Sequence, residues 1–215
     1  MTVATKGKPA TATARPGGRT ALVRRAVLAA TEDALIEYGF AGVELPAVAD
    51  AAKVGKTTVY RRWGSPQALV SDLLDDMAAR SVGATRTGDF TADLSANAEL
   101  VVKTLTDHRT GRLFSALIAA STHDADTKRA LADFYRTRVS EWAAAVTDAV
   151  ERGDLPSDTD ADEVVRYLSA PLYYQFMTTT KPLDAADADR AVRATAAAAR
   201  AGVFGGREQD TRGDS

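Results

Sequence analysis

Residues 53–63 hold side chains that could contact a polyanion such as DNA. This stretch, KVGKTTVYRRW, contains four Lys or Arg, two Thr and one Tyr. Cations pair with phosphate oxygens, hydroxyl groups donate to the same oxygens, and Arg or Lys can also bind the acceptor edge of guanine. The residues that we expect to contact DNA are Lys53, Lys56, Thr57, Thr58, Tyr60, Arg61 and Arg62.

The spacing within this stretch is typical of a helix with one buried and one exposed face. Val59 and Trp63 are four residues apart and share a face that can pack on neighbouring helices. Lys56, Tyr60 and Arg61 lie around the opposite arc. A helix seated in the major groove needs such an outward-facing set of donors, so the pattern predicts a recognition helix.

Three further predicted helices would hold the recognition helix in place. The first ends before Gly39, a stop signal, and its apolar face consists of Val23, Val27, Ala30, Ala34, Leu35 and Tyr38. The second covers residues 45–52, with Pro46 in its first turn, where a missing N–H costs nothing. After the recognition helix at 55–62, Ser65 and Pro66 start a helix that runs to about residue 80. Two short helices joined by a tight turn predict a helix-turn-helix.

Five separated elements around the recognition helix agree with a known pattern in both type and spacing. They are Gly39-Phe40, Val48-Ala49, Val54, Thr58-Val59-Tyr60 and Trp63. On these residues the segment 20–70 resembles the DNA-binding domain of the TetR family of transcriptional regulators. The resemblance implies an all-helical homodimer that binds operator DNA and senses a small molecule with its C-terminal half.

Three residues depart from the family pattern. Lys53 takes a turn position commonly filled by Gly, Gly55 takes the usual polar N-cap, and Pro66 replaces a Lys that contacts phosphate. A phosphate contact is therefore not assigned to Pro66. Lys53, Arg61 and Arg62 could supply phosphate contacts in its place. A Lys in the turn must also tolerate an unfavourable backbone conformation if the family geometry holds.

The remainder of the chain predicts five more helices and no strand. They cover residues 91–106, 109–121 and 124–151, a segment from Asp160 or Asp162 to residue 180, and a segment from Asp184 to near residue 205. The predicted fold class is all-α with about nine helices. The expected divisions are a disordered basic arm at 1–18, a helix-turn-helix DNA-binding domain at 19–65, a helical regulatory and dimerisation domain at 66–205 and a polar tail at 206–215. Arg15 and Arg19 of the arm could enter the minor groove, or the arm could be a solvated leader.

In TetR-like proteins the C-terminal helices hold the effector pocket. Effector contacts are therefore expected among aromatic and flexible residues, although most of these residues, Tyr135 included, could simply be core. The candidates are Phe114, Phe134, Trp142, Tyr173, Phe176 and Met177. Pro171 should kink its helix or free a carbonyl group. Lys103, Arg112 and Arg166 could bind an anionic ligand if they are buried, or could form exposed salt bridges.

The same resemblance implies that the last two helices dimerise as a four-helix bundle. Tyr174 lies in a segment similar to the penultimate helix of one TetR subgroup, where that helix forms the dimer contact. Ala191, Ala194 and Ala198 are spaced by three and four residues, which permits close approach of a partner helix or of a helix of the same chain. These four residues are the expected dimer contacts.

Composition narrows the class of protein. The chain has no cysteine, which excludes a disulfide framework and a thiol nucleophile. The longest uncharged segment, 167–180, is shorter than the ~18 residues that a membrane span needs, so we expect a cytoplasmic protein with no membrane contact. Residues 1–63 hold ten Lys or Arg against five acids, whereas the rest holds 17 against 24. A basic first third favours a polyanionic partner, although a solvated surface could show the same asymmetry.

The sequence therefore predicts a homodimeric regulator that binds a palindromic, double-stranded operator and is released by a small-molecule effector. One alternative is a TetR-fold protein that has lost specific DNA binding and acts as a ligand-binding or adaptor protein. An enzyme is the rival from another class, but His108 and His123 are not at a two-ligand spacing, and no nucleophile motif occurs. Residues 123–126 could bind a metal or cap a helix. No catalytic residue, metal or cofactor is expected.

Overall fold

The computed structural model describes residues 16–81 and 83–205, which form nine α-helices and one short 3-10 helix, η1. Their bounds are α1 Pro16–Tyr38, η1 Phe40–Gly42, α2 Leu45–Ala51, α3 Lys56–Arg62, α4 Pro66–Arg80, α5 Phe90–Thr106, α6 His108–Ser121, α7 Ala125–Glu151, α8 Ala161–Thr178 and α9 Ala185–Arg200. In this part of the chain no strand forms beyond a single bridge between Thr159 and Gly205. The predicted all-α class and helix number are confirmed.

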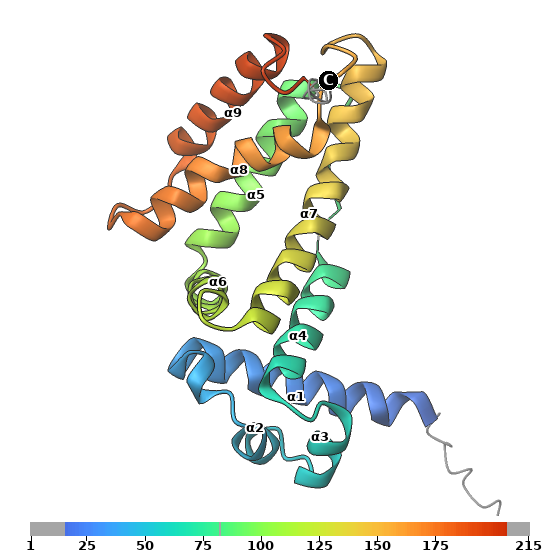
Figure 1. The fold of residues 1–215 in the computed structure, drawn as a ribbon, viewed down its shortest axis with the longest axis vertical. Helices are drawn as coiled ribbons and strands as arrows, with labels where there is room; N and C mark the ends of the chain where they lie inside the picture. Colours follow the sequence, from blue (N-terminus) through green and yellow to red (C-terminus); the bar gives the residue numbers. More distant parts are fainter. Residues whose placement is uncertain (1–15, 82, 206–215) are drawn as a thin grey trace, which may run out of the picture.

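The two ends of the molecule are built from different helices (Figure 1). Helices α1, α2 and α3 form one end, α5, α8 and α9 form the other, and α4 and α7 run lengthwise between them. Helix α6 is tied to α1, because Arg109 pairs with Glu32 and Asp33 at 2.6 Å each and Arg112 Nη2 donates to Ile36 O at 2.7 Å. The helix-turn-helix end therefore joins the rest of the molecule through both α4 and α6.

The first of two apolar cores fills the helix-turn-helix end. It includes Val27, Leu35 and Val48 from α1 and α2, and the predicted burial of Val59 and Trp63 is confirmed. The same core continues through leucines of α4, α6 and α7, namely Leu69, Leu73, Leu74, Leu113, Leu117 and Leu131. Apolar packing thus crosses residue 65, where the sequence placed the end of the DNA-binding domain.

The second core lies among α5, α7, α8 and α9. Its large side chains include Phe90, Leu94, Trp142, Val146, Leu168 and Leu172. Met77, Phe134 and Tyr135 pack against both cores, so these three residues form the apolar connection between the two ends of the molecule. No helix in the described residues is long and apolar enough to cross a membrane.

Helix α1 begins earlier than the sequence predicted. It starts at Pro16, inside the segment expected to be a disordered arm, because proline is well accommodated in the first turn of a helix. Arg19 is therefore helical, and its side chain is exposed. Arg15, the rest of the predicted arm and the predicted tail at 206–215 lie outside the described residues.

Two other local features differ from expectation, the exposure of Tyr38 and the end of α9, whereas the kink or freed carbonyl expected at Pro171 stays a prediction. Tyr38 is 66% exposed and does not join the packed face of α1. Helix α9 ends at Arg200, short of the predicted end, because Gly202 takes a φ of 75° that a helix cannot continue through. Helix α8 continues through Pro171 to Thr178.

Asp72 joins three segments of the helix-turn-helix end. Its carboxylate accepts from Arg24 Nε at 3.0 Å and Nη2 at 2.8 Å, and Oδ2 accepts from Trp63 Nε1 at 2.8 Å. Arg24 Nη1 also donates to Asp76 Oδ1 at 2.5 Å. Burial alone would raise the pKa of Asp72, but the hydrogen bonds from Arg24 and Trp63 outweigh it and lower that pKa below its ordinary value.

We predict that Asp72→Ala lowers the free energy of unfolding by about 1–3 kcal/mol, because it removes the acceptor of the Trp63 indole and one of the two carboxylates that accept from Arg24. Urea unfolding followed by circular dichroism measures this change. Asp75→Ala is the control, since Asp75 is an exposed residue of the same helix. Equal stability of the two variants would contradict the role of the Asp72 carboxylate.

The stabilisation by Asp72 should also depend on pH. Because its pKa is lowered in the folded state, the stabilisation is complete above pH ~4, the ordinary range for aspartate, and is lost as pH falls through the lowered pKa. The stability difference between the native protein and Asp72→Asn should therefore shrink in acid. A difference that stays constant from neutral pH to the acid limit of folding would argue against this linkage.

Candidate functional site

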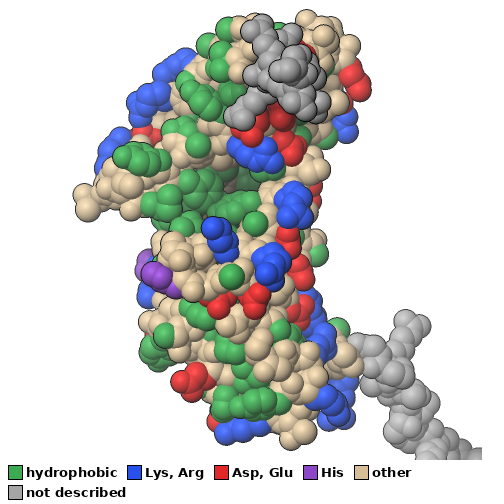
Figure 2. All heavy atoms as spheres, in the orientation of Figure 1, with side chains coloured by type: hydrophobic (Ala, Val, Ile, Leu, Met, Phe, Trp, Pro, Cys, Tyr) green, Lys and Arg blue, Asp and Glu red, His purple; other side chains and the backbone are tan. Residues whose placement is uncertain are grey.

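Helix α3 presents most of the predicted DNA contacts to solvent. The side chains of Lys53, Lys56, Thr57, Tyr60, Arg61 and Arg62 are exposed. Thr58 is half-buried, and Val59 is fully buried against α1 and α2. Lys or Arg side chains are visible at the end of the molecule that α2 and α3 form (Figures 1 and 2). The structure thus brings six of the seven predicted residues together on one exposed surface.

Two of these cations already have partners within the chain. Lys56 Nζ lies 3.1 Å from Asp50 Oδ2 of α2, and both side chains are more than half exposed. The Arg62 guanidinium lies 4.9 Å from the centre of the Trp63 ring, a cation–π arrangement. Both contacts are weak enough for a phosphate to compete with them, because exposed ion pairs contribute about 0–1 kcal/mol.

The departures from the family pattern have clear structural consequences. Lys53 adopts a φ of 55°, the left-handed conformation expected for a residue in place of glycine. Gly55 is the N-cap of α3 and gives it no side-chain hydrogen bond. Ser65 caps α4 by accepting from Ala68 N at 3.2 Å, and Pro66 is at the first helical position, as predicted.

A cavity of about 850 Å³ lies among α4, α5, α6, α7 and α8. Figure 2 shows the corresponding hollow at mid-height, lined by hydrophobic side chains with Lys or Arg at its edge. Five of the six predicted effector contacts line it, namely Phe114, Phe134, Trp142, Tyr173 and Met177. Phe176 does not line the cavity. It packs against the second core beside Gly111, where α6 begins close to the end of α5.

Aromatic rings form much of one wall. The ring centres of Phe114 and Phe134 are 5.7 Å apart, those of Phe134 and Tyr135 are 5.4 Å apart, and those of Tyr135 and Tyr173 are 5.7 Å apart. The Tyr135 and Tyr173 rings meet edge to face. This connected cluster gives a ligand a rigid apolar surface.

Two buried polar atoms on the wall have no hydrogen-bond partner among the described residues. They are Asn97 Nδ2, from a side chain only 4% exposed, and Tyr135 Oη. Burial is the largest cause of the raised pKa of Tyr135, and a polar interaction with the Tyr173 hydroxyl, which lacks the geometry of a good hydrogen bond, raises it further. Both unpartnered atoms are covered by neighbouring atoms, and a buried polar atom without a partner is energetically costly.

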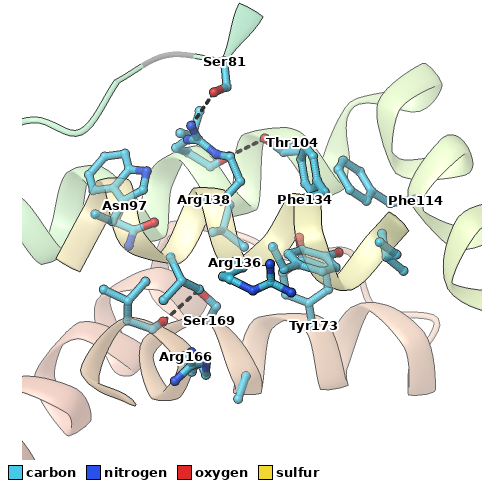
Figure 3. Close-up of a pocket in the computed structure, with 18 of the residues that line it drawn as sticks. Ser81, Asn97, Thr104, Phe114, Phe134, Arg136, Arg138, Arg166, Ser169 and Tyr173 are labelled. Atoms are coloured by element: carbon cyan, nitrogen blue, oxygen red, sulfur yellow. Dashed lines mark hydrogen bonds between the residues drawn. The ribbon is translucent and has the colours of Figure 1, made fainter. Parts of the chain in front are cut away.

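Three arginines also line the cavity, and the sequence identified only one of them (Figure 3). Arg138 is held by Ser81 Oγ and Glu141 Oε2, Arg136 Nη2 donates to Asp133 Oδ1 at 2.5 Å, and Arg166 pairs with two acids of its own helix. The four-residue spacing from Phe134 to Arg138 was the available signal for Arg138. Lys103 and Arg112 do not line the cavity.

The predicted dimer contacts separate into exposed and internal residues. Tyr174 is 68% exposed, and Ala194 is exposed on α9. Ala191 is buried in the second core, and Ala198 is half-buried against it, so Ala191 packs within its own chain. In the second half of α9 the exposed alanines are Ala194, which was predicted, and Ala197, which was not. Because alanines are dense in α9, their spacing alone did not identify which stripe faces outward.

The segment that could have bound a metal forms a helix cap. Asp124 caps α7 by accepting from Thr127 N at 2.7 Å, and it also accepts from Gln67 Nε2 of α4 at 2.9 Å. Asp124 thus provides an acceptor for a free N–H group in the first turn of α7 and connects this turn to α4. His108 and His123 are both exposed.

Family models match both parts of the chain. Residues 27–73 match the model described as bacterial regulatory proteins, tetR family. Residues 84–195 match the model described as tetracyclin repressor-like, C-terminal domain. The first match includes α2 and α3, and the second includes α5 to α8.

Similar proteins are regulators rather than enzymes. The DNA-binding transcriptional repressor TetR of Mycobacteroides abscessus is 30% identical over 172 residues, which cover 78% of this chain and 88% of the relative. YdeS of Bacillus subtilis, an uncharacterized HTH-type transcriptional regulator, is 28% identical over 160 residues, covering 72% and 78%. The solved structure of the TetR family regulator SCO0332 aligns with a TM-score of 0.65 at 28% identity and covers 81% of this chain and 97% of that one.

We predict that Lys53→Gly stabilises the protein relative to Lys53→Ala by about 0.5–1 kcal/mol, because only glycine adopts a φ of 55° without steric cost. Both variants remove the same charge, so the comparison isolates the backbone conformation. Urea unfolding at fixed protein concentration measures the difference. A Lys53→Gly variant no more stable than Lys53→Ala would show that the turn is not strained.

Proposed function

Because the chain belongs to the TetR family of bacterial transcriptional regulators, we propose that it acts as a homodimeric repressor whose operator affinity is lowered by a small molecule in the cavity. One observation carries this proposal. An exposed donor face on α3 and a cavity of about 850 Å³ occur in one chain, and α4, the helix that follows α3, contributes to the cavity wall.

The DNA-binding role rests on the exposed surface of α3. We assign Tyr60 and Arg61 to contacts inside the major groove, with Lys53, Lys56 and Arg62 on phosphates. A seven-residue helix reads only a few base pairs, so specific binding at about 10⁻⁸ to 10⁻¹¹ M requires two copies on two half-sites. This requirement supports a palindromic operator.

The dimer surface is assigned to the exposed faces of α8 and α9. On α8 the large side chains Tyr167, Tyr174 and Met177 are 48%, 68% and 53% exposed. On α9 the small side chains Ala194 and Ala197 leave room for another helix to approach. An exposed apolar surface beside a small-residue stripe is what a four-helix bundle between two copies needs.

Release from DNA is assigned to a shift of α4. Met77 lines the cavity, and the C-cap residue Ser81 accepts a hydrogen bond from Arg138 on the cavity wall. Towards the start of the same helix, Asp72 holds Trp63 at the end of α3. A ligand that binds one position of α4 better than another would change the separation of the two recognition helices and lower operator affinity by that difference.

The first experiment is binding of the purified protein to the DNA that flanks its own gene, measured by fluorescence anisotropy with non-specific competitor DNA and a salt series. A competitor-resistant complex at nanomolar protein supports the operator proposal. Weak binding that falls steeply with salt at every DNA tested, including sequences selected from the whole genome, would favour the alternative of a ligand-binding protein without specific DNA recognition.

We predict that Tyr60→Ala and Arg61→Ala each lower operator affinity about 10- to 100-fold, since each removes a groove contact from both half-sites. Arg129→Ala is the control, because Arg129 is an exposed arginine on α7, away from α3. Circular dichroism and sedimentation should remain unchanged in all three variants. Operator binding that is unaffected in both α3 variants would remove the assignment of α3 as recognition helix.

We predict that Ala197→Glu converts the dimer to a monomer and lowers operator affinity at least about 100-fold, because it places a carboxylate where two α9 helices must approach closely. Sedimentation equilibrium measures the oligomeric state. Ala119→Glu, at an exposed alanine of α6, is the matched control. An Ala197→Glu protein that remains a dimer would require a different dimer surface.

A further inference from the structure

The charges on the cavity wall are of one sign. Its lining includes Arg136, Arg138 and Arg166, and it includes no Asp, Glu, Lys or His. The carboxylates that pair with these arginines, those of Asp133, Glu141, Asp162 and Glu163, are not part of the lining. A ligand in the cavity therefore meets guanidinium groups, and the carboxylates paired with them do not line it.

The three arginines are not equivalent. Arg166 is matched by two acids of α8, whereas Arg138 pairs with Glu141 and Arg136 pairs with Asp133. The Arg138 side chain is only 14% exposed, so less water screens its charge than at the other two. Among the described residues Arg136 uses only Nη2, which leaves Nε and Nη1 for another acceptor.

The uncharged part of the wall favours a ligand with an apolar body. The cluster of Phe114, Phe134, Tyr135 and Tyr173 offers ring faces and edges. Asn97 and Tyr135 also contribute to the wall, but their atoms Nδ2 and Oη are covered by neighbouring atoms, so the rings and the arginines are the groups that a ligand meets directly. A cavity of about 850 Å³ is within the usual range for a drug-sized molecule.

We propose that the cavity binds an amphipathic anion, with its aromatic or alkyl body against the aromatic cluster and its carboxylate or similar acidic group at Arg136 and Arg138. The inference rests on the proposed function, since it names the chemical class of the effector. Arg suits this role because its planar fork of N–H groups matches a carboxylate and keeps its charge. A cationic ligand of the same shape would be repelled by the same arginines.

The test compares three fluorescent probes that share one ring system, 1-pyrenebutyrate, 1-pyrenebutanol and 1-pyrenebutylamine, which are anionic, neutral and cationic at neutral pH. Fluorescence titration of the full-length protein without DNA gives each affinity. We expect the acid to bind about tenfold more tightly than the alcohol and the amine to bind most weakly. Equal affinity for acid and alcohol, or no binding of the acid, overturns the proposal.

Variants locate the charge recognition. Arg136→Gln and Arg138→Gln should each weaken the acid about five- to tenfold and leave the alcohol within about twofold. Arg129→Gln is the matched control, because Arg129 pairs with Asp126 three residues before it on α7, as Arg136 does with Asp133, but does not line the cavity. Circular dichroism shows whether Arg138→Gln folds. If it does not, Arg136→Gln and the three probes with the native protein still test the proposal. An acid preference that survives in every folded cavity variant overturns the proposal.

A final arm separates this inference from the proposed function. Operator binding is measured by anisotropy at saturating 1-pyrenebutyrate and at saturating 1-pyrenebutanol. An acid preference in the cavity without any effect on operator affinity supports the ligand class and overturns ligand-driven release. Intact operator binding by a protein that shows no acid preference overturns the ligand class alone.

Discussion

The carboxylate of Asp72 fixes the end of the recognition helix relative to α1 and α4. It accepts the Trp63 indole N–H, and it accepts two N–H groups of Arg24. Because Val59 of α3 is also locked in the apolar core, α3 has little freedom to turn about its own axis. The direction in which Tyr60 and Arg61 point therefore depends on where α4 lies. A change at the far end of α4 has a rigid path to the DNA-facing surface.

The far end of α4 lies where the two cores meet. Met77, Phe134 and Tyr135 pack against both cores, and all three line the cavity. Packed interiors do not deform continuously, so a molecule that enters this space must select among arrangements of these side chains. The cavity and the helix-turn-helix end thus share an apolar junction and helix α4, and the proposed coupling of ligand binding to DNA binding would act through both. The hydrogen bonds of Arg109 and Arg112 to α1 supply a second connection through α6.

The sequence predicted the helix-turn-helix well because its signals are local. The burial of Val59 and Trp63 follows from their spacing, whereas the left-handed conformation of Lys53 was expected only because the family pattern places glycine at that turn position. The residues that line the cavity were harder to predict from the sequence, because they come from five helices and no local pattern specifies how these helices are rotated relative to one another. Phe176 was predicted as an effector contact from its residue type and Ala191 as a dimer contact from its spacing, yet Phe176 packs against the second core outside the cavity and Ala191 is buried within that core. Arg138 was missed because an arginine near a glutamate on a helix usually forms an exposed ion pair.

The position of Arg138 links the chemistry of the proposed ligand to the proposed release. Its guanidinium already binds Ser81, which ends α4, and Glu141 on its own helix. An anion that engages the same guanidinium must share its N–H groups with Ser81 or displace it, so its binding free energy depends on where the end of α4 lies. A neutral ligand of equal shape lacks this dependence and would fill the cavity with less effect on α4. Differential affinity for two positions of one helix is the requirement for an effector, and under this proposal the half-buried guanidinium of Arg138, which contacts the end of α4, would supply it.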